Sequence, residues 1–427
     1  MTTRQRREPA RRSGTRRRLK PIAATLGLTL LAGCAAGYVY LKHLDSNIKH
    51  TPLRAAVALP PPPPGPTDTA GRSAMNILVI GTDSRAGLDG AYGDRDNTGI
   101  GNNDVDIVLH IAPDRRSAVA VNLPRDTLVD LPECKDPKTG EVFRATTHRP
   151  LNEALGRGGP GCVTSTVESV TQLKIDHYAL VTFQGVKDLT DAVGGVPVNL
   201  CTPIHDRESH LDLSAGPHTL DGEQGLAFVR TRMAVQDGSS LGRFTMQRAY
   251  LSALLRKVTS AGTLLDPTTA FPVVEAATRS ITVDDAIDGT TKLVGLANEL
   301  SNIKPGSVQF VQPEMHYTED DPSPSLRQKA AFTQPAADQL FRLVRDGQPL
   351  TPNTEPSPAT GTGTDRPSAT TPTPSGTPSA SDTDTPTDAP ADALGSTPSA
   401  SPSGLGVTVH NGDEAGCVKG WTGSLEQ

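Results

Sequence analysis

The sequence lacks several short motifs by which enzymes of phosphate and metal chemistry are recognised. It contains no Walker loop of the form G-x-x-x-x-G-K-[ST], no H-E-x-x-H and no cysteine or histidine spacing typical of zinc sites. These absences exclude a P-loop NTPase, a zincin-type protease and a zinc-ribbon protein. Any phosphate chemistry must therefore be carried by another arrangement of side chains.

Acidic residues outnumber basic ones outside the N-terminus. The first twenty residues hold eight arginines, one lysine and one acid, a charge of +8, and the whole chain carries −6, which leaves −14 for the rest. A body of this charge would be repelled by a nucleic-acid backbone, and no helix-turn-helix pattern is visible. We expect no nucleic-acid partner and interpret the basic tail, residues 1–20, as a topology signal.

A segment without any charge follows this tail at residues 21–41. At about 1.5 Å per residue it is long enough for the core of a bilayer. The cations before it predict a cytoplasmic N-terminus, and hence a single-pass cell-membrane protein with its body outside the cytoplasm. "LAGC" (31–34) resembles a lipoprotein cleavage box with Cys34 as the acylated residue. We favour an uncleaved anchor, because it would use Tyr38 and Tyr40 at the interface.

Biased composition marks the other boundaries. Residues 42–72 contain five consecutive prolines and predict a semi-rigid spacer that holds the body off the membrane. Residues 348–405 are rich in Pro, Ser and Thr and predict disorder. The folded body is expected at 73–347, and a short remnant at 406–427 closes the chain.

Only five cysteines are present. Outside the cytoplasm disulfides persist, and Cys134 and Cys162 both lie in loop-like stretches, so we predict a bridge between them. Cys201 is then expected to be an unpaired, buried thiol. No motif surrounds any cysteine, which disfavours a catalytic thiol.

The stretch "NILVIGTDSRAG" (76–87) joins a buried strand to charged residues. Residues 77–80 are apolar and largely β-branched, which predicts a central strand. Gly81 allows a sharp turn. Asp83 and Arg85 would then project over the rim of the sheet.

Two further strands show the same arrangement. "DIVLHIA" (106–112) follows Asp104, and the apolar run 117–132 is interrupted by Arg125 and Asp126. Because acids and arginines recur at strand ends, we interpret them as a site and not as isolated surface ion pairs.

Alternating elements indicate a layered α/β domain whose sheet direction the periodicity leaves open. The expected helices are residues 163–173, 183–193 and 244–258, and the expected later strands are 178–183 and 196–200.

A second group of arginines lies further along the chain. In "GLAFVRTRM" (225–233) Arg230 and Arg232 occupy alternate positions, so an extended backbone would point them the same way. Arg243 precedes the last predicted helix. Guanidinium groups bind phosphate oxygens in pairs, and two carboxylates, Asp83 and Asp104, make sense beside them if Mg²⁺ bridges to the same phosphates. The sequence therefore predicts phosphoryl chemistry by charge neutralisation and positioning.

The body resembles the LytR-CpsA-Psr family over about residues 74–347, in an actinobacterial-type form. The segments that carry the resemblance, in this order, are "NILVIGTDSR", "NLPRDT", "RPLNEALGRGG", "DHYALVTFQGVKDLTDAVGGVPV", "LDGEQGLAFVRTR" and "LGRFTMQRAYLSALL". Members of that family are membrane-anchored bacterial enzymes that transfer a glycopolymer from a polyprenyl-pyrophosphate carrier to peptidoglycan and leave a phosphodiester. The closing "GVTVHNGDEAG" is similar to the start of a small C-terminal domain that some members carry.

The resemblance also implies a fold and roles for residues. The implied fold is a three-layer α/β/α sandwich around a mixed sheet with an apolar lipid-binding cavity. Asp83 and Asp104 would be Mg²⁺ ligands, and Asp126 is a candidate general base, equally readable as a partner of Arg125. The expected pyrophosphate-binding set is Arg85, Arg125, Arg149, Arg230, Arg232 and Arg243, of which Arg85, Arg125, Arg230 and Arg232, with Asp126, are the expected catalytic residues.

Three positions depart from the family pattern. Asn102 stands where an arginine is usual, Ser240 where an acid is usual and Met246 where an arginine is usual. These changes leave open a weakly active or non-catalytic lipid-binding or regulatory paralogue. Hydrolysis of the lipid pyrophosphate is a further alternative, because water can replace the sugar hydroxyl.

Overall fold

The centre of the protein is an eight-stranded mixed sheet. The computed structural model describes residues 15–85, 88, 99–231, 243–260, 266–350, 408–411 and 417–418. In spatial order the strands are β1 (Lys49–Thr51), β14 (Ile281–Asp284), β9 (His177–Val181), β2 (Met75–Thr82), β3 (Asn103–Ile111), β4 (Ala118–Leu123), β15 (Val308–Gln312) and β18 (Thr408–Asn411). The pairs β1–β14, β9–β2 and β4–β15 are parallel and the others antiparallel, so the predicted mixed sheet is confirmed.

Strands β2, β3 and β4 are antiparallel neighbours that follow one another in the chain. The turn between β3 and β4 is closed by a hydrogen bond at 3.0 Å from the Ala112 N–H to the Ser117 carbonyl. Arg115 sits in this turn with a φ of 59°.

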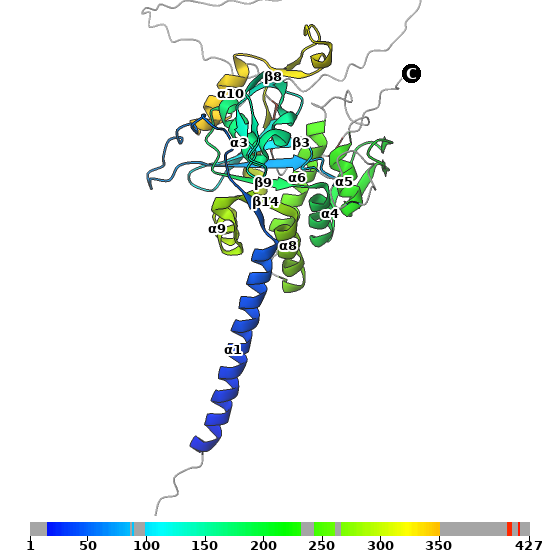
Figure 1. Cartoon of the computed structure of the whole chain (residues 1–427). Helices are drawn as coiled ribbons and strands as arrows, with labels where there is room; N and C mark the ends of the chain where they lie inside the picture. The colour runs from blue at the N-terminus through cyan, green and yellow to red at the C-terminus, as the bar shows by residue number, and fades with distance from the viewer. Residues whose placement is uncertain are drawn as a thin grey trace, which may run out of the picture.

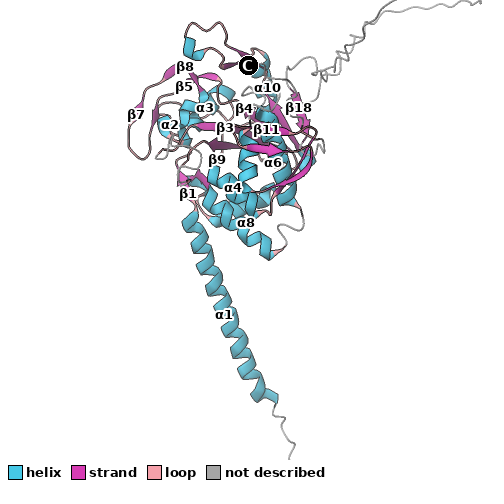
Figure 2. Ribbon diagram, turned by 90° about the vertical axis from the view of Figure 1, so that its right-hand side faces the viewer, coloured by secondary structure: helices cyan, strands magenta, loops and turns pink. Residues whose placement is uncertain are grey.

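Helices cover both faces of the sheet (Figures 1 and 2). The helices are α1 (Thr15–Asn47), α2 (Ala154–Gly158), α3 (Pro160–Thr171), α4 (Phe183–Ala192), α5 (Gly222–Arg230), α6 (Arg243–Thr259), α8 (Pro267–Ser280), α9 (Thr290–Leu300) and α10 (Ala336–Arg345). Leu78 and Val108 pack with α3 and α10 on one face. Their chain neighbours Ile77 and Ile107 pack with Phe244 of α6 on the other. This alternation produces the three layers.

Short elements connect the layers. They are the strands β5 (Leu128–Leu131), β6 (Cys134–Lys135), β7 (Val142–Phe143), β8 (Thr146–Pro150), β10 (Val196–Leu200), β11 (Ile204–Asp206), β12 (Leu211–Leu213), β13 (Gly216–Leu220), β16 (Met315–Tyr317) and β17 (Ala330–Phe332), with single 3₁₀ turns η1 (Leu151–Glu153), η2 (Asp285–Ile287), η3 (Pro305–Ser307) and η4 (Pro324–Leu326). The expected strand 196–200 is present, but it pairs with β13 in a separate two-stranded sheet.

The chain enters the fold well before residue 73. Leu44 and Ile48 are buried, and β1 is a strand of the central sheet. Further on, Arg54 forms a 2.6 Å ion pair with the buried Glu168 of α3. The expectation of a spacer over 42–72 is therefore wrong for its first part, because apolar and paired side chains fix residues 44–57 to the body.

Helix α1 projects from the body as a single long helix (Figure 1). Within the part of the chain that the structure describes, none of the helices combines the length and the apolar character that crossing a bilayer requires.

Two disulfides are present among the described residues. Cys134 is bonded to Cys162, the pair chosen from the sequence. Cys201 is bonded to Cys417, so the expectation of an unpaired Cys201 is wrong. The chain returns to the body here: Val418 donates its N–H at 2.8 Å to the Asn199 carbonyl, and this pairing brings the adjacent Cys417 to Cys201.

Candidate functional site

The strand register brings three charged segments to one edge of the sheet. Thr82 at the end of β2 lies opposite Asn103 at the start of β3. Asp106 of β3 lies opposite Leu123 at the end of β4. The residues that follow β2, open β3 and follow β4 are therefore neighbours in space, although about 20 positions separate them in the chain.

Asp104 is the centre of this edge. One carboxylate oxygen accepts a hydrogen bond from Arg125, which follows β4, and the other accepts one at 3.0 Å from Arg243, the first residue of α6. All three side chains are largely buried, with exposed fractions of 15 %, 19 % and 5 % respectively. We call Asp104, Arg125 and Arg243 the acid–arginine cluster.

Asp126 and Lys329 extend the cluster. Lys329 donates to one oxygen of Asp126 at 2.8 Å, and the Arg125 Nε donates to the other at 3.4 Å. Burial raises the pKa of Asp126, but the Lys329 hydrogen bond and the charges of Arg125 and Lys329 outweigh it, so its pKa is lowered. A depressed pKa makes Asp126 a weak base, and the geometry favours its role as the partner that holds Arg125.

The pKa of Arg125 itself is raised. Burial opposes the charge of its guanidinium, but the neighbouring carboxylates of Asp104 and Asp126 outweigh that effect. Arg125 is therefore a fixed cation beside two acids.

Asp83 lies next to the start of β3. It accepts a hydrogen bond at 2.7 Å from the Asn102 N–H and donates its own N–H to the Asn102 carbonyl at 3.1 Å. These contacts use only the backbone of Asn102, so its departure from the family's arginine leaves the position of Asp83 intact. Gly101 has a φ of +76°, and a Cβ there would lie 2.7 Å from the Asp83 Oδ1.

The two predicted metal ligands are consistent with Mg²⁺ by their chemistry. Mg²⁺ in proteins is commonly bound by one or two carboxylates, with waters and substrate phosphates completing its shell. Asp83 and Asp104 supply two carboxylates at the same edge of the sheet. Among the described residues no group of three or more His, Cys, Asp or Glu side chains could hold a metal ion.

The second arginine group is arranged differently from the prediction. Residues 222–230 form helix α5, so the expectation of an extended backbone at Arg230 is wrong. The Arg230 guanidinium lies 5.0 Å from the centre of the Phe183 ring. Arg232 lies outside the described residues.

A small apolar cluster lies next to Arg230. Phe183 forms a buried cluster with Leu88 and Leu226. A guanidinium stacked on an aromatic ring beside such a cluster suits a ligand with one anionic and one apolar part.

Arg149 is not brought into the acid–arginine cluster. It lies on β8, and its guanidinium makes two hydrogen bonds of 3.0 and 2.7 Å to Glu153. Arg85 follows Asp83 at the end of β2 and is half-buried. Its carbonyl accepts the Leu88 N–H at 3.1 Å.

Met246, the third departure, lies in the core. It is fully buried and packs with Phe228 of α5 and with Tyr250. The missing guanidinium is thus replaced by ordinary apolar packing at a site away from solvent. Ser240 lies outside the described residues.

Sequence reasoning missed a polar pair behind Asp104. The Asn103 side chain donates to the Asp106 Oδ2 at 2.6 Å and accepts the Leu155 N–H at 3.2 Å, which ties β3 to α2. Burial and the nearby Asp104 charge raise the pKa of Asp106 to about 8, although the Asn103 hydrogen bond lowers it. The only sequence signal was an acid inside a run of β-branched residues. Lys329, also missed, had none.

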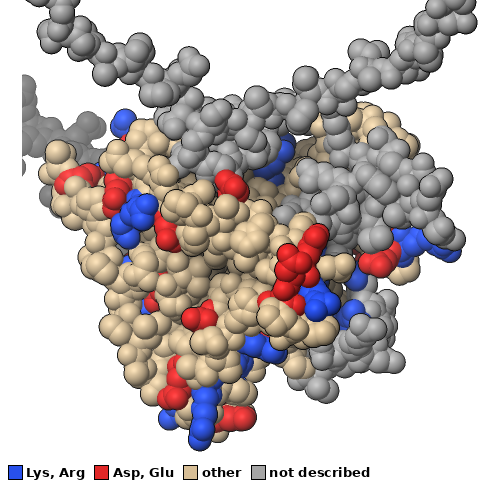
Figure 3. Space-filling model, turned by 90° about the horizontal axis from the view of Figure 1, so that it is seen from above, with Lys and Arg blue, Asp and Glu red and all other residues tan. Residues whose placement is uncertain are grey.

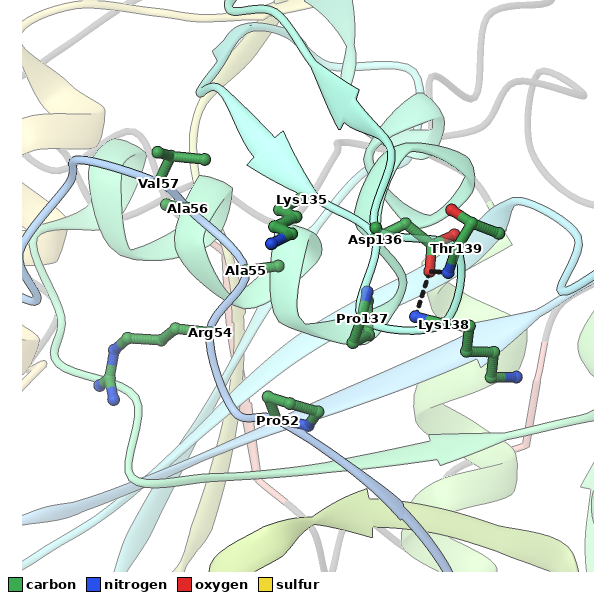
Figure 4. Close-up of a pocket in the computed structure, with 11 residues that line it drawn as sticks. Pro52, Arg54, Ala55, Ala56, Val57, Lys135, Asp136, Pro137, Lys138 and Thr139 are labelled. Atoms are coloured by element: carbon green, nitrogen blue, oxygen red, sulfur yellow. Dashed lines mark hydrogen bonds between the residues drawn. The ribbon is translucent and has the colours of Figure 1, made fainter.

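Two cavities lie away from the cluster. One of about 730 Å³ lies between residues 52–57 and the turn after β6, and Figure 4 shows its Arg54 and Lys138 side chains pointing away from each other. Another of about 430 Å³ lies beside His110. Seen from above, the described surface mixes both charge signs among uncharged residues (Figure 3). The expected lipid cavity remains a prediction.

Fold and site together define an α/β protein that gathers arginines and carboxylates at one edge of a mixed sheet. The profile of the LytR_cpsA_psr family matches residues 44–332, and the chain belongs to this family. The match starts at residue 44, where the chain enters the fold.

Individual relatives match a smaller part of the chain than the family profile does. The chain is similar to a probable cell wall biosynthesis protein, LcpB, of Corynebacterium glutamicum, with 36 % identity over 51 % of this chain and 50 % of LcpB. It is 32 % identical to a polyisoprenyl-teichoic acid–peptidoglycan teichoic acid transferase, TagU, of Oceanobacillus iheyensis, over 46 % of this chain and 57 % of TagU. The chain thus spans about half the length of the curated relatives it matches.

The chain is also similar to several solved structures. A LytR-Csp2A-Psr enzyme from Actinomyces oris is 20 % identical, covers 69 % of this chain and 96 % of its own, and has a TM-score of 0.47. TagT bound to LI-WTA is 19 % identical, covers 70 % of this chain and 98 % of its own, and has a TM-score of 0.48.

Proposed function

We propose that this protein transfers an anionic glycopolymer from a polyprenyl-pyrophosphate carrier to peptidoglycan and forms a phosphodiester. The observation that carries the proposal is the binding of two arginines, Arg125 and Arg243, by the single carboxylate of Asp104. Two guanidiniums gathered at one buried point are suited to a ligand with several anionic oxygens. The names of TagU-type relatives, which include teichoic acid transfer to peptidoglycan, point to the same chemistry.

The reaction follows from charge and position. A sugar hydroxyl of the acceptor attacks the phosphorus that bears the glycan, and the bond from this phosphorus to the bridging oxygen breaks. The electron pair stays with the leaving polyprenyl phosphate, and the hydroxyl proton passes to solvent or a base. Arg125 and Arg243 stabilise the charge that grows on the leaving phosphate. Asp126 keeps Arg125 oriented.

Mg²⁺ belongs to the proposal. Asp83 and Asp104 would hold it, and Arg85 and Arg232, together with Arg230, would complete the phosphate-binding set. When bound, Mg²⁺ would neutralise charge on the phosphate oxygens. The carboxylate of Asp104 then serves both the metal and the arginines.

The lipid part of the substrate is proposed to lie beside Arg230. Phe183, Leu88 and Leu226 form a small apolar cluster there. A polyprenyl chain could pack against this cluster while its pyrophosphate stays with the arginines.

We also propose that the protein is anchored in the cell membrane by residues 21–41, with its N-terminus in the cytoplasm and its body outside. The exposure of Leu28, Leu30 and Leu31 on α1, at 68–70 %, supports this, because apolar side chains on every side of a projecting helix are unfavourable in water.

The test is transfer by the purified full-length protein. It is incubated in detergent with a polyprenyl-pyrophosphate glycan donor and a peptidoglycan oligosaccharide, and the phosphodiester product is measured by mass spectrometry. We expect product with Mg²⁺ and at least about a hundredfold less with Asp83→Ala. Equal rates for Asp83→Ala and wild type would refute the metal assignment.

The same experiment separates the alternatives. A lipid-binding or regulatory paralogue would retain the donor and release neither product. A pyrophosphatase would release polyprenyl phosphate with no acceptor present.

A further inference from the structure

Helix α1 is joined rigidly to the body. Leu44 in its last turns is 2 % exposed. Asp45 accepts the Thr290 N–H at the start of α9, at 2.9 Å. The helix runs without interruption to Asn47, and β1 starts two residues later. No described loop separates the exposed apolar part of α1 from the fold.

Helix α8 runs beside α1 in the same direction. Tyr40 packs edge-to-face on Phe271, with ring centres 5.6 Å apart. One turn further on, His43 contacts Glu275 at 2.9 Å, and Asn47 then contacts Thr278 at 3.4 Å. The first turns of α8 therefore lie at the height of Tyr40, near the end of the uncharged segment.

This part of α8 presents an unusual side chain to its surroundings. Phe271 is 57 % exposed, although it is a large aromatic residue. Tyr38 on α1 is 64 % exposed, and Lys42 lies over its ring at 6.0 Å. Aromatic side chains next to a lysine at the end of an apolar helix are typical of a membrane–water interface.

We propose that the first turns of α8 lie in the headgroup layer of the lipid bilayer, with Phe271 inserted beside Tyr40. The inference rests on the proposed membrane anchor. Since α1 and α8 pack side by side through Tyr40 and Phe271, burial of α1 in lipid up to Leu41 brings Phe271 to the lipid surface. The body then rests on the membrane and is not held away from it.

The partner is a lipid surface because the aromatic side chains of Tyr38, Tyr40 and Phe271 continue the exposed apolar surface of α1. A cation that suits lipid phosphates lies beside it, since Lys42 is 63 % exposed. Acids are also present, since Glu275 pairs with Arg279 at 2.6 Å. Insertion is therefore driven by the aromatic side chains, with modest help from charge.

The test uses the full-length protein in phosphatidylcholine–phosphatidylglycerol vesicles. Cys34 is the free cysteine of the described residues and takes an environment-sensitive fluorophore in the wild type. Two matched proteins carry Cys34→Ser with either Phe271→Cys or Val142→Cys. Val142 is 50 % exposed and lies on β7, which contacts α2 on the other face of the sheet. Quenching is measured with lipids that carry a nitroxide near the headgroup.

We expect quenching at position 271 to exceed that at position 142 by about twofold or more, with Cys34 also quenched by nitroxide placed deeper in the acyl chain. If Cys34 is quenched but positions 271 and 142 are equal, the anchor stands and the docking inference is overturned. If Cys34 is not quenched by any lipid, the anchor fails and the inference with it. Transfer activity in detergent is scored separately, so a failure of the proposed chemistry is distinguishable.

Discussion

Asp104 accepts a hydrogen bond at 3.0 Å from Arg243, which lies 139 residues further along the chain. This contact links the start of β3 to the start of α6 at the edge of the sheet where the candidate site lies. Because the carboxylate also binds Arg125, it keeps two guanidiniums together that would otherwise repel each other.

We expect Arg243→Ala to lower the free energy of unfolding by about 2 to 3 kcal/mol, because it leaves the buried Asp104 with one cation in place of two. Urea denaturation measures this. The control is Arg72→Ala, which removes a 51 % exposed guanidinium-bearing side chain from its ion pair with Asp68 and should cost at most about 1 kcal/mol. Equal losses for both variants would show that the Asp104–Arg243 contact is not a structural link.

Arg125 and Arg149 are expected to differ in catalysis. Arg125→Ala should reduce transfer at least about a hundredfold, because its guanidinium belongs to the acid–arginine cluster. Arg149→Ala should reduce it less than about tenfold, since Glu153 holds that side chain at 2.7 Å. Rates are measured in the donor–acceptor assay. A larger loss for Arg149→Ala would mean that the substrate draws Arg149 from Glu153 into the site.

The sequence predicted this edge of the sheet well and the second arginine group poorly. Short apolar runs with an acid or an arginine at an end predicted the strands β2, β3 and β4. In the structure, the antiparallel pairing of these strands brings Asp104 and Arg125 together. The prediction of an extended segment at Arg230 used only the alternation of Arg230 and Arg232 and left out the residues that precede them. The capping box of Asp221 and Gln224, which starts α5, was a local signal for a helix that outweighed it.

Contacts between segments that are far apart in the chain could not be predicted from the sequence. Lys329 reaches Asp126 because Thr127 and Ala330 pair as a bridge, and nothing local in "RQKAAF" indicates this. Cys417 could not be assigned to Cys201 for the same reason: the pairing depends on backbone hydrogen bonds of Val418 across more than 200 residues.

Gly101→Ala should weaken Mg²⁺ binding about tenfold or more. A Cβ at this position would lie 2.7 Å from the Asp83 Oδ1 and 2.6 Å from the Ser84 backbone nitrogen, so Asp83 must move. Gly140→Ala is the matched control: its φ is +74°, but a Cβ there meets nothing within 4 Å. Titration calorimetry with Mg²⁺ and a non-transferable lipid pyrophosphate measures the affinity. An equal effect of both substitutions would point to general backbone strain, and no effect would remove Asp83 from the metal site.

The two disulfides should have different roles. Cys134 and Cys162 are fully buried, and loss of their bond through a Cys134→Ser/Cys162→Ser double variant should cost about 2 to 4 kcal/mol in global unfolding. Cys417→Ser should instead release β18 locally, because this strand lies at the edge of the sheet and β15 is its one neighbouring strand among the described residues. Amide hydrogen exchange distinguishes them: β18 should lose protection while β3 keeps it. Loss of protection in β3 would show that the second disulfide supports the whole sheet.

Asp106 gives the stability a specific pH dependence. Burial raises the pKa of Asp106 from its ordinary value of 3.8 to about 8 in the folded protein, and its Oδ1 has no hydrogen-bond partner among the described residues. Between these values the folded state holds one proton more than the unfolded state, so this residue lowers the free energy of unfolding as the pH rises from about 4 to about 8. Asp106→Asn keeps a donor and acceptor of the same shape but does not titrate.

The stability of Asp106→Asn relative to wild type should therefore increase by at least about 1 kcal/mol between pH 5 and pH 8, measured by urea denaturation in EDTA so that Asp104 stays metal-free. The same difference for Asp346→Asn, whose side chain is 51 % exposed and whose partner is the always-charged Arg345, should stay flat over this range. A flat difference for Asp106→Asn as well would mean that the carboxylate of Asp106 is charged in the folded protein, and that an unseen donor, such as water, satisfies the oxygen behind Asp104.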